Sequence, residues 1–382
     1  MKKIKNVMTN GVQNDTYAIL KGRVHIIIEP TMFLAHISQK SSKESVRAYG
    51  NDLLKFFREL LEVSSTAGLI GYDFRDVTDN EMNAYLNAYL RRKHGLKLKS
   101  INRHIATLRS FYDYAYSHGW MAERKDFSFS VRSDEVKTSE LEGITKQFAL
   151  EYMSKDDLKT LLESVPTNNL FNCKRDQVAL MLGYYANYRT HELVNSNNLR
   201  IKDLEELITL DERGIPSITK PMKIYGKGNK VRSVRVWPEL VQPLYEFLQM
   251  SKRVGAKHLI CRQDGTPLIT EGHGTKNFRR AVISLLLKGE LSLKEANLWK
   301  LRHFHGLRKC YATNAVTYCH REGYDKRTFV TQWMGHADYS TTEVYIYFES
   351  LINHRVLDNE EIDMEKVIKA SQSEGFYKRE SR

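Results

Sequence analysis

The spacing of apolar residues predicts helices over most of residues 31–127. Ser41-x-x-Glu44 is a capping box, and the apolar residues that follow it recur at intervals of three and four. Thr78-x-x-Glu81 is a second capping box, before a helix that Gly95 ends, and Ser100 opens a third helix. Three or four amphipathic helices of this kind predict a small all-α domain.

The segments on either side of this domain lack such a period. RVHIIIEP, residues 23–30, reads as a short strand that Pro30 ends, so residues 1–30 form an N-terminal extension that could bind DNA arms. Residues 128–150 are polar and irregular, which predicts a linker.

The rest of the chain is again helical, apart from one β section. A helix begins at Ser154, and β-branched and turn residues between 207 and 237 fit a small antiparallel sheet. Helical spacing resumes near residue 238. The predicted fold is therefore mostly α with a small antiparallel β-sheet, with a second domain over residues 151–358 and a tail over 359–382.

Composition agrees with a folded, two-domain protein. The chain has 382 residues, of which 41% are hydrophobic and 27% charged. No apolar run approaches the roughly 18 residues that span a bilayer, and the N-terminus has no signal-peptide apolar region. The four cysteines are scattered without a CxxC pair, which favours a reducing cytoplasm and no zinc site.

The positive charge is concentrated in one stretch. A net charge of +13 is weak evidence for nucleic acid by itself. Residues 91–109, RRKHGLKLKSINRHIATLR, contain no acid, although a solvated helix face normally interleaves acids. Such a stretch fits DNA phosphates, and its candidate DNA-binding residues are Arg91, Arg92, Lys93, Lys97, Lys99, Arg103 and Arg109.

The segment MGHADYSTTEVYIYF, residues 334–348, contains a candidate nucleophile. Ser340-Thr-Thr-Glu343 fits a capping box, so a helix should begin near Thr341 and bury Val344, Phe348 and Leu351 on one stripe. Tyr345 and Tyr347 fall on opposite edges of that stripe, half-buried, and periodicity does not choose between them.

Three further stretches carry cations and histidines. NYRTHEL places Arg189 three residues before Glu192, which by itself indicates a local ion pair. YGKGNKVR fits a hairpin with solvated lysines better than a phosphate-binding loop. In RHFHGLRKC, His305 and Arg308 share a helix face.

These residues suit phosphoryl transfer without a metal or another cofactor. The histidine and acid spacings match neither a zinc site nor a magnesium cage. Guanidinium groups can instead neutralise the phosphate, a tyrosine can attack it, and a lysine or histidine can donate a proton to the leaving oxygen.

In order and spacing, these motifs resemble the phage integrase family of tyrosine recombinases, over nearly the whole chain. Arg189 with Glu192, Lys227 in GKGNK, His305-Gly-Leu-Arg308, Gly335-His336 and Tyr345 carry the resemblance. KESVRAYGNDLLKFF and SINRHIATLRSFYDYAYSHGWM are similar to helices of the family's core-binding, SAM-like domain.

The resemblance implies a role for each motif residue. Arg189 and Arg308 would hold the scissile phosphate, with Glu192 as a supporting acid. His305 and His336 would hydrogen-bond the phosphate and assist proton transfer. Lys227 would protonate the departing 5′-oxygen, and Tyr345 would form the 3′-phosphotyrosyl link.

Some positions depart from the family pattern. Ala186-Asn187-Tyr188 replaces the usual Thr-Gly-Leu, Lys309 replaces a common histidine, and Gly306 replaces a frequent acid. Two neighbours, His303 and Tyr347, would exchange with His305 and Tyr345 if the register slipped by two residues. A two-residue step on a helix turns the side chain by about 200°, which disfavours the exchange.

The resemblance implies a site-specific recombinase acting on double-stranded DNA with inverted-repeat core sites, as a homotetramer on paired sites. An accessory DNA-bending protein could assist it, and residues 351–370 could be a helix that protomers exchange. Integration, excision or transposition of a mobile element is the favoured role, and resolution of chromosome or plasmid dimers is the alternative. A non-catalytic DNA-binding protein, a type IB topoisomerase and a hairpin-forming resolvase are the competing functions. The DNA sequence of the target is not predicted.

Overall fold

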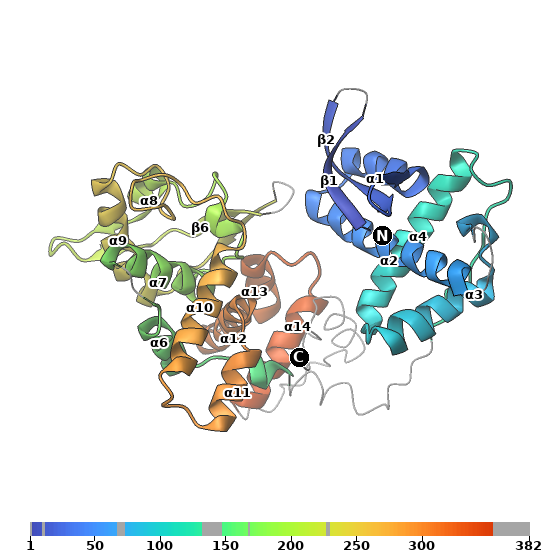
Figure 1. Cartoon of the computed structure of the whole chain (residues 1–382). Helices are drawn as coiled ribbons and strands as arrows, with labels where there is room; N and C mark the ends of the chain where they lie inside the picture. The colour runs from blue at the N-terminus through green and yellow to red at the C-terminus, as the bar shows by residue number, and fades with distance from the viewer. Residues whose placement is uncertain are drawn as a thin grey trace. The chain divides into compact units, whose positions relative to one another are not determined.

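A computed structural model describes residues 2–9, 12–66, 73–131, 147–166, 169–226 and 230–353. The chain divides into two compact units, Met1–Val136 and Lys137–Arg382, called here the N-terminal and C-terminal units (Figure 1). Both are mainly helical with small antiparallel sheets, which confirms the predicted fold class.

The N-terminal unit combines a helical core with a sheet. Its helical elements are α1 (Ile28–Lys40), α2 (Lys43–Thr66), the 3₁₀ turn η1 (Phe74–Asp76), α3 (Asp79–Ala84), η2 (Tyr85–Lys93) and α4 (Leu98–Ser117). Its strands are β1 (Lys2–Thr9), β2 (Val12–Lys21) and β3 (His25–Ile27).

The three strands form one antiparallel sheet in the order β1-β2-β3, which the sequence did not predict. The central strand buries Ala18, Ile19 and Leu20, and it packs against α1 and α2. Only residues 25–27 of the predicted strand at 23–30 are extended. Pro30 lies in the first turn of α1, where its missing N–H costs no helical hydrogen bond.

Two predicted helix starts in this unit are displaced. Ser41 ends α1, because its N–H donates to the Ile37 carbonyl, and Ser42 precedes α2 instead. Helix α4 begins at Leu98 after the extended Lys97, so Ser100 is already inside its first turn. The capping box of Thr78 and Glu81 is confirmed, with both reciprocal hydrogen bonds present.

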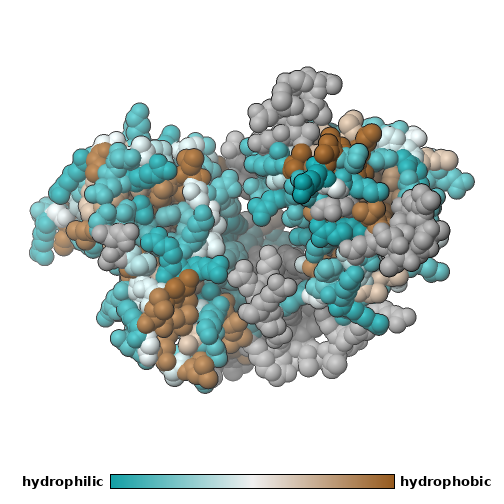
Figure 2. Space-filling view, viewed as in Figure 1, coloured by the Kyte–Doolittle hydropathy of each residue, from teal (hydrophilic) through white to brown (hydrophobic). Residues whose placement is uncertain are grey.

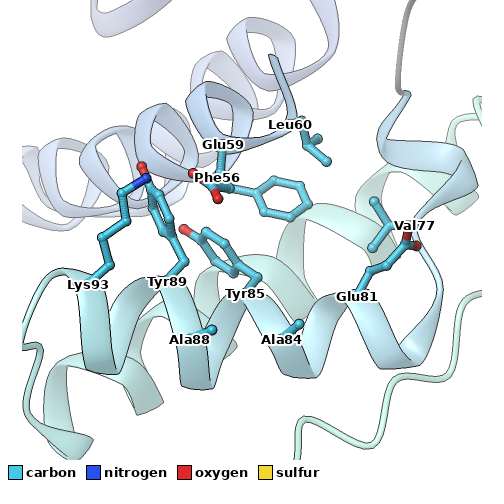
Figure 3. Close-up of a pocket in the computed structure, with 10 residues that line it drawn as sticks. All are labelled: Phe56, Glu59, Leu60, Val77, Glu81, Ala84, Tyr85, Ala88, Tyr89 and Lys93. Atoms are coloured by element: carbon cyan, nitrogen blue, oxygen red, sulfur yellow. The ribbon is translucent and has the colours of Figure 1, made fainter. Parts of the chain in front are cut away.

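Helix α3 continues as a π-helix, η2. Tyr85 and Tyr89 stack on each other with ring centroids 5.4 Å apart and line a mainly apolar pocket between η2 and α2 (Figure 3). Residues 128–131, at the start of the predicted linker, are hydrogen-bonded to residues of α3 and η2. The Ser128 and Ser130 N–H groups donate to Asp79 and Asn83.

The C-terminal unit is built around α12. Its helices are α6 (Lys155–Glu163), α7 (Leu170–Tyr185), η3 (Glu192–Val194), α8 (Ile201–Leu207), α9 (Pro238–Arg253), α10 (His273–Leu287), α11 (Leu293–Leu301), α12 (Phe304–Glu322), α13 (Lys326–Met334) and α14 (Ser340–Ile352). Helix α12 is buried on nearly all sides, by α7, α10, α13 and α14 (Figure 1).

The predicted single sheet consists of two separate ladders. Strands β4 (Thr209–Leu210) and β5 (Pro216–Ser217) pair with each other, as do β6 (Met222–Tyr225) and β7 (Val231–Val234). The β6–β7 hairpin is where GKGNK was expected to turn. The predicted helix start at Ser154 is confirmed, and the structure adds a capping box there, with the Ser154 hydroxyl accepting from the Asp157 N–H.

Most of the visible surface is hydrophilic (Figure 2). An apolar patch lies over α10 and α11, where Ile283, Leu287 and Leu293 are exposed (Figure 2). Within the described residues, no helix is long and apolar enough to cross a bilayer.

Candidate active site

The loop after α7 carries the first arginine. Glu192 accepts a hydrogen bond from the Arg189 backbone N–H at 2.7 Å and another from Arg189 Nη1 at 3.0 Å. The loop turns through Asn187, which has φ +60°, a left-handed value that asparagine tolerates better than most residues. The predicted local Arg–Glu pair is therefore present, and it orients both the main chain and the side chain of Arg189.

A second arginine, which the sequence did not single out, binds the same carboxylate. Arg232 of β7 donates from Nη1 to Glu192 Oε1 and from Nη2 to Glu192 Oε2, each at 2.6 Å. Burial opposes the charge on Glu192, but the hydrogen bonds and charges of Arg232 and Arg189 outweigh it and lower the pKa of Glu192 to about 2. Glu192 is therefore ionised at neutral pH, although its side chain is fully buried.

Arg308 lies one turn into α12 and is buried beside this pair. Its Nη1 donates to the Asn187 carbonyl at 2.9 Å, and its Nη2 donates to the Met334 carbonyl. Burial first, and then the charges of Arg189 and Arg232, lower the pKa of Arg308 to about 9. A negatively charged ligand at Arg308 would offset both effects, as a phosphodiester does.

The two histidines at the start of α12 have different environments. His303 precedes the helix, and its Nδ1 accepts from the Gly306 N–H at 3.0 Å, so it acts as a helix cap. His305 is exposed. Loss of hydration, followed by the charges of Arg308 and Lys309, lowers the pKa of His305, even though solvent reaches the ring. The nearby cations favour that direction by themselves, because each disfavours a further positive charge.

Tyr345 and His336 lie against each other. Their rings stack with centroids 6.0 Å apart and an interplanar angle of 16°. His336 Nδ1 lies 3.1 Å from Thr342 Oγ1, which fixes the ring from the first turn of α14. The charge of Tyr345 would also raise the pKa of Arg308, so the phenol lies within electrostatic range of that guanidinium.

Three expectations about α14 are wrong. Tyr339 occupies the N-cap without a side-chain cap, and Ser340 is helical because Asp338 Oδ1 accepts its N–H. Tyr345 is 1% exposed rather than half-buried, and Leu351 is exposed rather than part of the buried stripe. Phe148 covers the Tyr345 ring edge-on at 5.4 Å, which explains the deeper burial.

Lys309, at the position of a common family histidine, forms a buried ion pair with Glu151. Glu151 belongs to a helical turn over residues 147–151, at the end of the predicted linker. Lys309 Nζ also lies 5.2 Å from the centre of the Phe148 ring. The ion pair thus supports the aromatic residue that covers Tyr345.

Lys227 lies outside the described residues, so its predicted role stays a prediction. The hairpin that carries it approaches the site closely. A Cβ on Gly226 would lie 3.2 Å from Glu192 Oε1, and the Gly226 N–H donates to the Lys230 carbonyl. No group of three or more His, Cys, Asp or Glu side chains suited to a metal ion is found among the described residues.

Family models match both units of the chain. A model described as phage integrase, N-terminal SAM-like domain, matches residues 31–119, and one described as phage integrase family matches residues 151–350. The chain belongs to the phage integrase family. It is accordingly a tyrosine recombinase, an enzyme that breaks and rejoins DNA strands.

Relatives with curated names agree with this assignment. The recombinase is 28% identical over 324 residues to "Tyrosine recombinase XerC" of Thermodesulfovibrio yellowstonii, covering 84% of this chain and 91% of that protein. It is 24% identical over 323 residues to "Tyrosine recombinase XerD" of Staphylococcus saprophyticus, covering 84% and 93%.

Two solved structures share the fold. XerH recombinase bound to difH substrate, in a pre-cleavage complex, matches with a TM-score of 0.55 and 19% identity, over 83% of this chain and 80% of that chain. A lambda integrase (75–356) dimer bound to a COC′ core site matches with a TM-score of 0.55 and 14% identity, over 87% and 97%.

The candidate DNA-binding residues of the recombinase differ in exposure and in the contacts of their side chains with the protein. Arg103 is engaged by the buried Asp52, with Nε at 3.0 Å from Oδ2 and Nη2 at 2.7 Å from Oδ1. Lys93 lies over the Tyr89 ring and Arg109 over the Phe129 ring. Arg92 and Lys97 are exposed, Arg91 is half-buried, and Lys99 is the second residue of α4. Residues 91–109 contain no acid, and Asp52 of α2 provides the carboxylate that pairs with Arg103.

Proposed function

We propose that the recombinase cleaves DNA at inverted-repeat core sites through a covalent link between Tyr345 and the 3′-phosphate. The observation that carries this proposal is the surplus of positive charge beside the Tyr345 ring. Arg189 and Arg232 bind one carboxylate, Glu192, and Arg308 donates to the Asn187 carbonyl that Arg232 also binds. A phosphodiester bound there would gain charge-assisted hydrogen bonds, and these would strengthen as charge builds on the phosphate oxygens.

The proposed step is an in-line displacement. The Tyr345 oxygen forms a bond to phosphorus while the bond from phosphorus to the 5′-oxygen breaks. We assign the tyrosine proton to His305, whose imidazole is neutral at pH 7 because its pKa lies below the usual value. Lys227 donates a proton to the departing 5′-oxygen. Religation runs the same exchange in reverse with a different strand, and the bond energy stays in the phosphotyrosyl link.

The stacking of Tyr345 on His336 supports it over Tyr347 as the nucleophile. Tyr347 is half-buried, two residues further along α14. The capping role of His303 likewise supports His305 as the group that meets the phosphate.

A trapping assay tests the nucleophile. A cognate inverted repeat, selected from a random library by its covalent capture on the wild-type protein, is built as a nicked duplex so that the short cleaved strand diffuses away. We expect wild type and Tyr347→Phe to accumulate a denaturation-resistant protein–DNA adduct, and Tyr345→Phe to form none. An adduct with Tyr345→Phe would show that another residue attacks. Absence of any adduct with wild type would contradict the proposed cleavage.

We further propose that four protomers act on two paired sites, as the lambda integrase tetramer on a Holliday junction suggests by its similar fold. Movement of a mobile element is one cellular role of such a reaction. Resolution of chromosome or plasmid dimers is the second candidate, because the curated relatives named XerC and XerD match over more than nine-tenths of their own lengths. A plasmid with two directly repeated sites tests resolution, and a two-plasmid assay tests integration.

A further inference from the structure

Arg232 occupies the middle of the candidate active site without belonging to the set of residues that the family motifs supply. It lies on β7, five residues after Lys227, and is only 8% exposed. Both of its terminal nitrogens donate to protein acceptors: Nη1 to Glu192, and Nη2 to Glu192 and to the Asn187 carbonyl at 2.9 Å. Those nitrogens are therefore committed to the protein rather than directed at a ligand.

Arg232 makes half of the hydrogen bonds that hold Glu192. The carboxylate accepts two bonds from Arg232 and two from Arg189, one of them from the Arg189 backbone. Without Arg232, the buried carboxylate would keep only contacts from its own loop. It could then tilt toward Arg189 and neutralise the guanidinium that should bind phosphate.

The same guanidinium also fixes the second phosphate-binding arginine. The Asn187 carbonyl accepts from Arg232 Nη2 and from Arg308 Nη1, both at 2.9 Å. One backbone oxygen thus sets the separation between Arg232 and Arg308. The aliphatic stem of Arg232 also lies against Gly335, next to His336: a Cβ on Gly335 would stand 2.8 Å from Arg232 Cδ.

We propose that Arg232 is a positioning residue for strand cleavage: it holds Glu192 and the Asn187 carbonyl so that Arg189 and Arg308 meet the scissile phosphate together. This inference rests on the proposed function. Arg232 acts on the two phosphate-binding arginines and not on the proton that Lys227 delivers to the leaving oxygen.

The test compares Arg232→Lys and Arg232→Gln with wild type in single-turnover cleavage of the nicked duplex. Arg213→Gln is the control, because Arg213 is exposed on the β4–β5 loop and loses the same charge. We expect DNA affinity to stay within about threefold while the first-order cleavage rate falls about 100-fold, the cost of misplacing reacting groups by about 1 Å. Lysine should restore only part of the rate, because it cannot make the two-pronged contact with Glu192.

A second substrate separates the phosphate-binding arginines from the leaving group. A 5′-bridging sulfur leaves as a thiolate, which needs much less protonation than an alkoxide because a thiol is far more acidic. We expect Lys227→Ala to recover on this substrate and the Arg232 variants to remain slow. The inference would be overturned if the Arg232 variants cleaved the sulfur substrate at the wild-type rate. It would also be overturned if they cleaved the ordinary substrate at the wild-type rate.

A double-mutant cycle covers the case in which Arg232→Gln folds poorly. Because Arg232 acts partly through Glu192, Arg232→Lys should slow cleavage less in a Glu192→Gln background than in the wild type, where the contacts with Glu192 and with the Asn187 carbonyl are both lost. Full additivity would contradict the coupling. If wild type itself forms no Tyr345 adduct, the proposed function fails. If wild type forms it and the Arg232 variants match its rate, only the present inference fails.

Discussion

Each unit buries one carboxylate among cations, and the two arrangements have different charge balances. In the N-terminal unit, Asp52 receives both prongs of Arg103 and the Thr107 hydroxyl, and His104 Nε2 lies 2.9 Å from its Oδ1. In the C-terminal unit, Glu192 is shared by Arg189 and Arg232, and Arg308 joins them through a backbone carbonyl.

The same type of contact leaves a different net charge in the two units. One carboxylate against one guanidinium is neutral, so the Asp52 pair ties α2 to α4 and leaves little charge for a ligand. One carboxylate against three guanidiniums leaves a net charge of about +2, which a phosphate can neutralise. Removing one member from each cluster should therefore affect different properties.

The largest effect is expected for Arg308→Gln. Loss of a buried donor to the phosphate should slow single-turnover cleavage about 10³-fold, as when a donor to a developing negative charge is removed. Arg103→Gln is the matched change in the other cluster and should leave the cleavage rate of the bound complex within about threefold. Equal losses in the two variants would contradict the division of roles.

The next effect is a loss of stability. Asp52→Asn should lower the free energy of unfolding by about 2 kcal/mol, because the charge-assisted hydrogen bonds of a buried carboxylate are lost. Asp113→Asn is the control: its ion pair with Arg124 is exposed on both sides and should contribute almost nothing. Denaturant unfolding of both variants provides the comparison. An Asp52→Asn protein as stable as the control would show that the Arg103 contact does not support the fold.

The pH dependence of stability should distinguish Glu192. Its pKa is about 2 in the folded protein and near 4.5 in the unfolded chain, so its stabilising effect is present above pH 4.5 and is lost as the pH falls toward 2. The difference in unfolding free energy between wild type and Glu192→Gln should thus be constant from pH 7 to 5 and narrow below. A difference that persists unchanged at pH 3 would mean that the carboxylate is not held ionised.

The smallest effect concerns DNA affinity in the N-terminal unit. Arg92→Gln should reduce the slope of log K against log salt by about 1, since an exposed arginine on phosphate releases about one counterion. Arg103→Gln should change the slope by much less, because its charge is already paired with Asp52. Binding isotherms at four or five salt concentrations measure both slopes. A larger slope change for Arg103 would show that DNA displaces Asp52.

Local signals account for the parts of the fold that the sequence predicted. The capping box at Thr78 depends on residues three apart, so it can be found without knowledge of the fold. The same pattern failed at Ser340, because Asp338 captures the Ser340 N–H and starts the helix one residue earlier. The sequence shows Asp338 two residues before Ser340. It does not show that the Asp338 carboxylate accepts the Ser340 N–H.

Contacts between distant residues account for what was missed. Asp52 supplies the acid that the basic stretch lacks from 51 residues away, and Arg232 reaches Glu192 across 40. The N-terminal sheet was missed because its central strand β2 buries three consecutive residues, Ala18, Ile19 and Leu20, whereas a half-buried strand buries alternate ones. The motif residues themselves were identified by family resemblance, since no local period distinguishes Tyr345 from Tyr347.

The close fit of Gly335 against the stem of Arg232 links two positions that lie about a hundred residues apart. Gly335 has φ +65°, and any side chain there would meet Arg232. Related chains with arginine at the position of residue 232 should therefore carry glycine at the position of residue 335. Chains with a short side chain in place of that arginine should admit asparagine there, which tolerates the left-handed backbone. The two positions should co-vary across the family, a pattern that an alignment can reveal without any experiment on this protein.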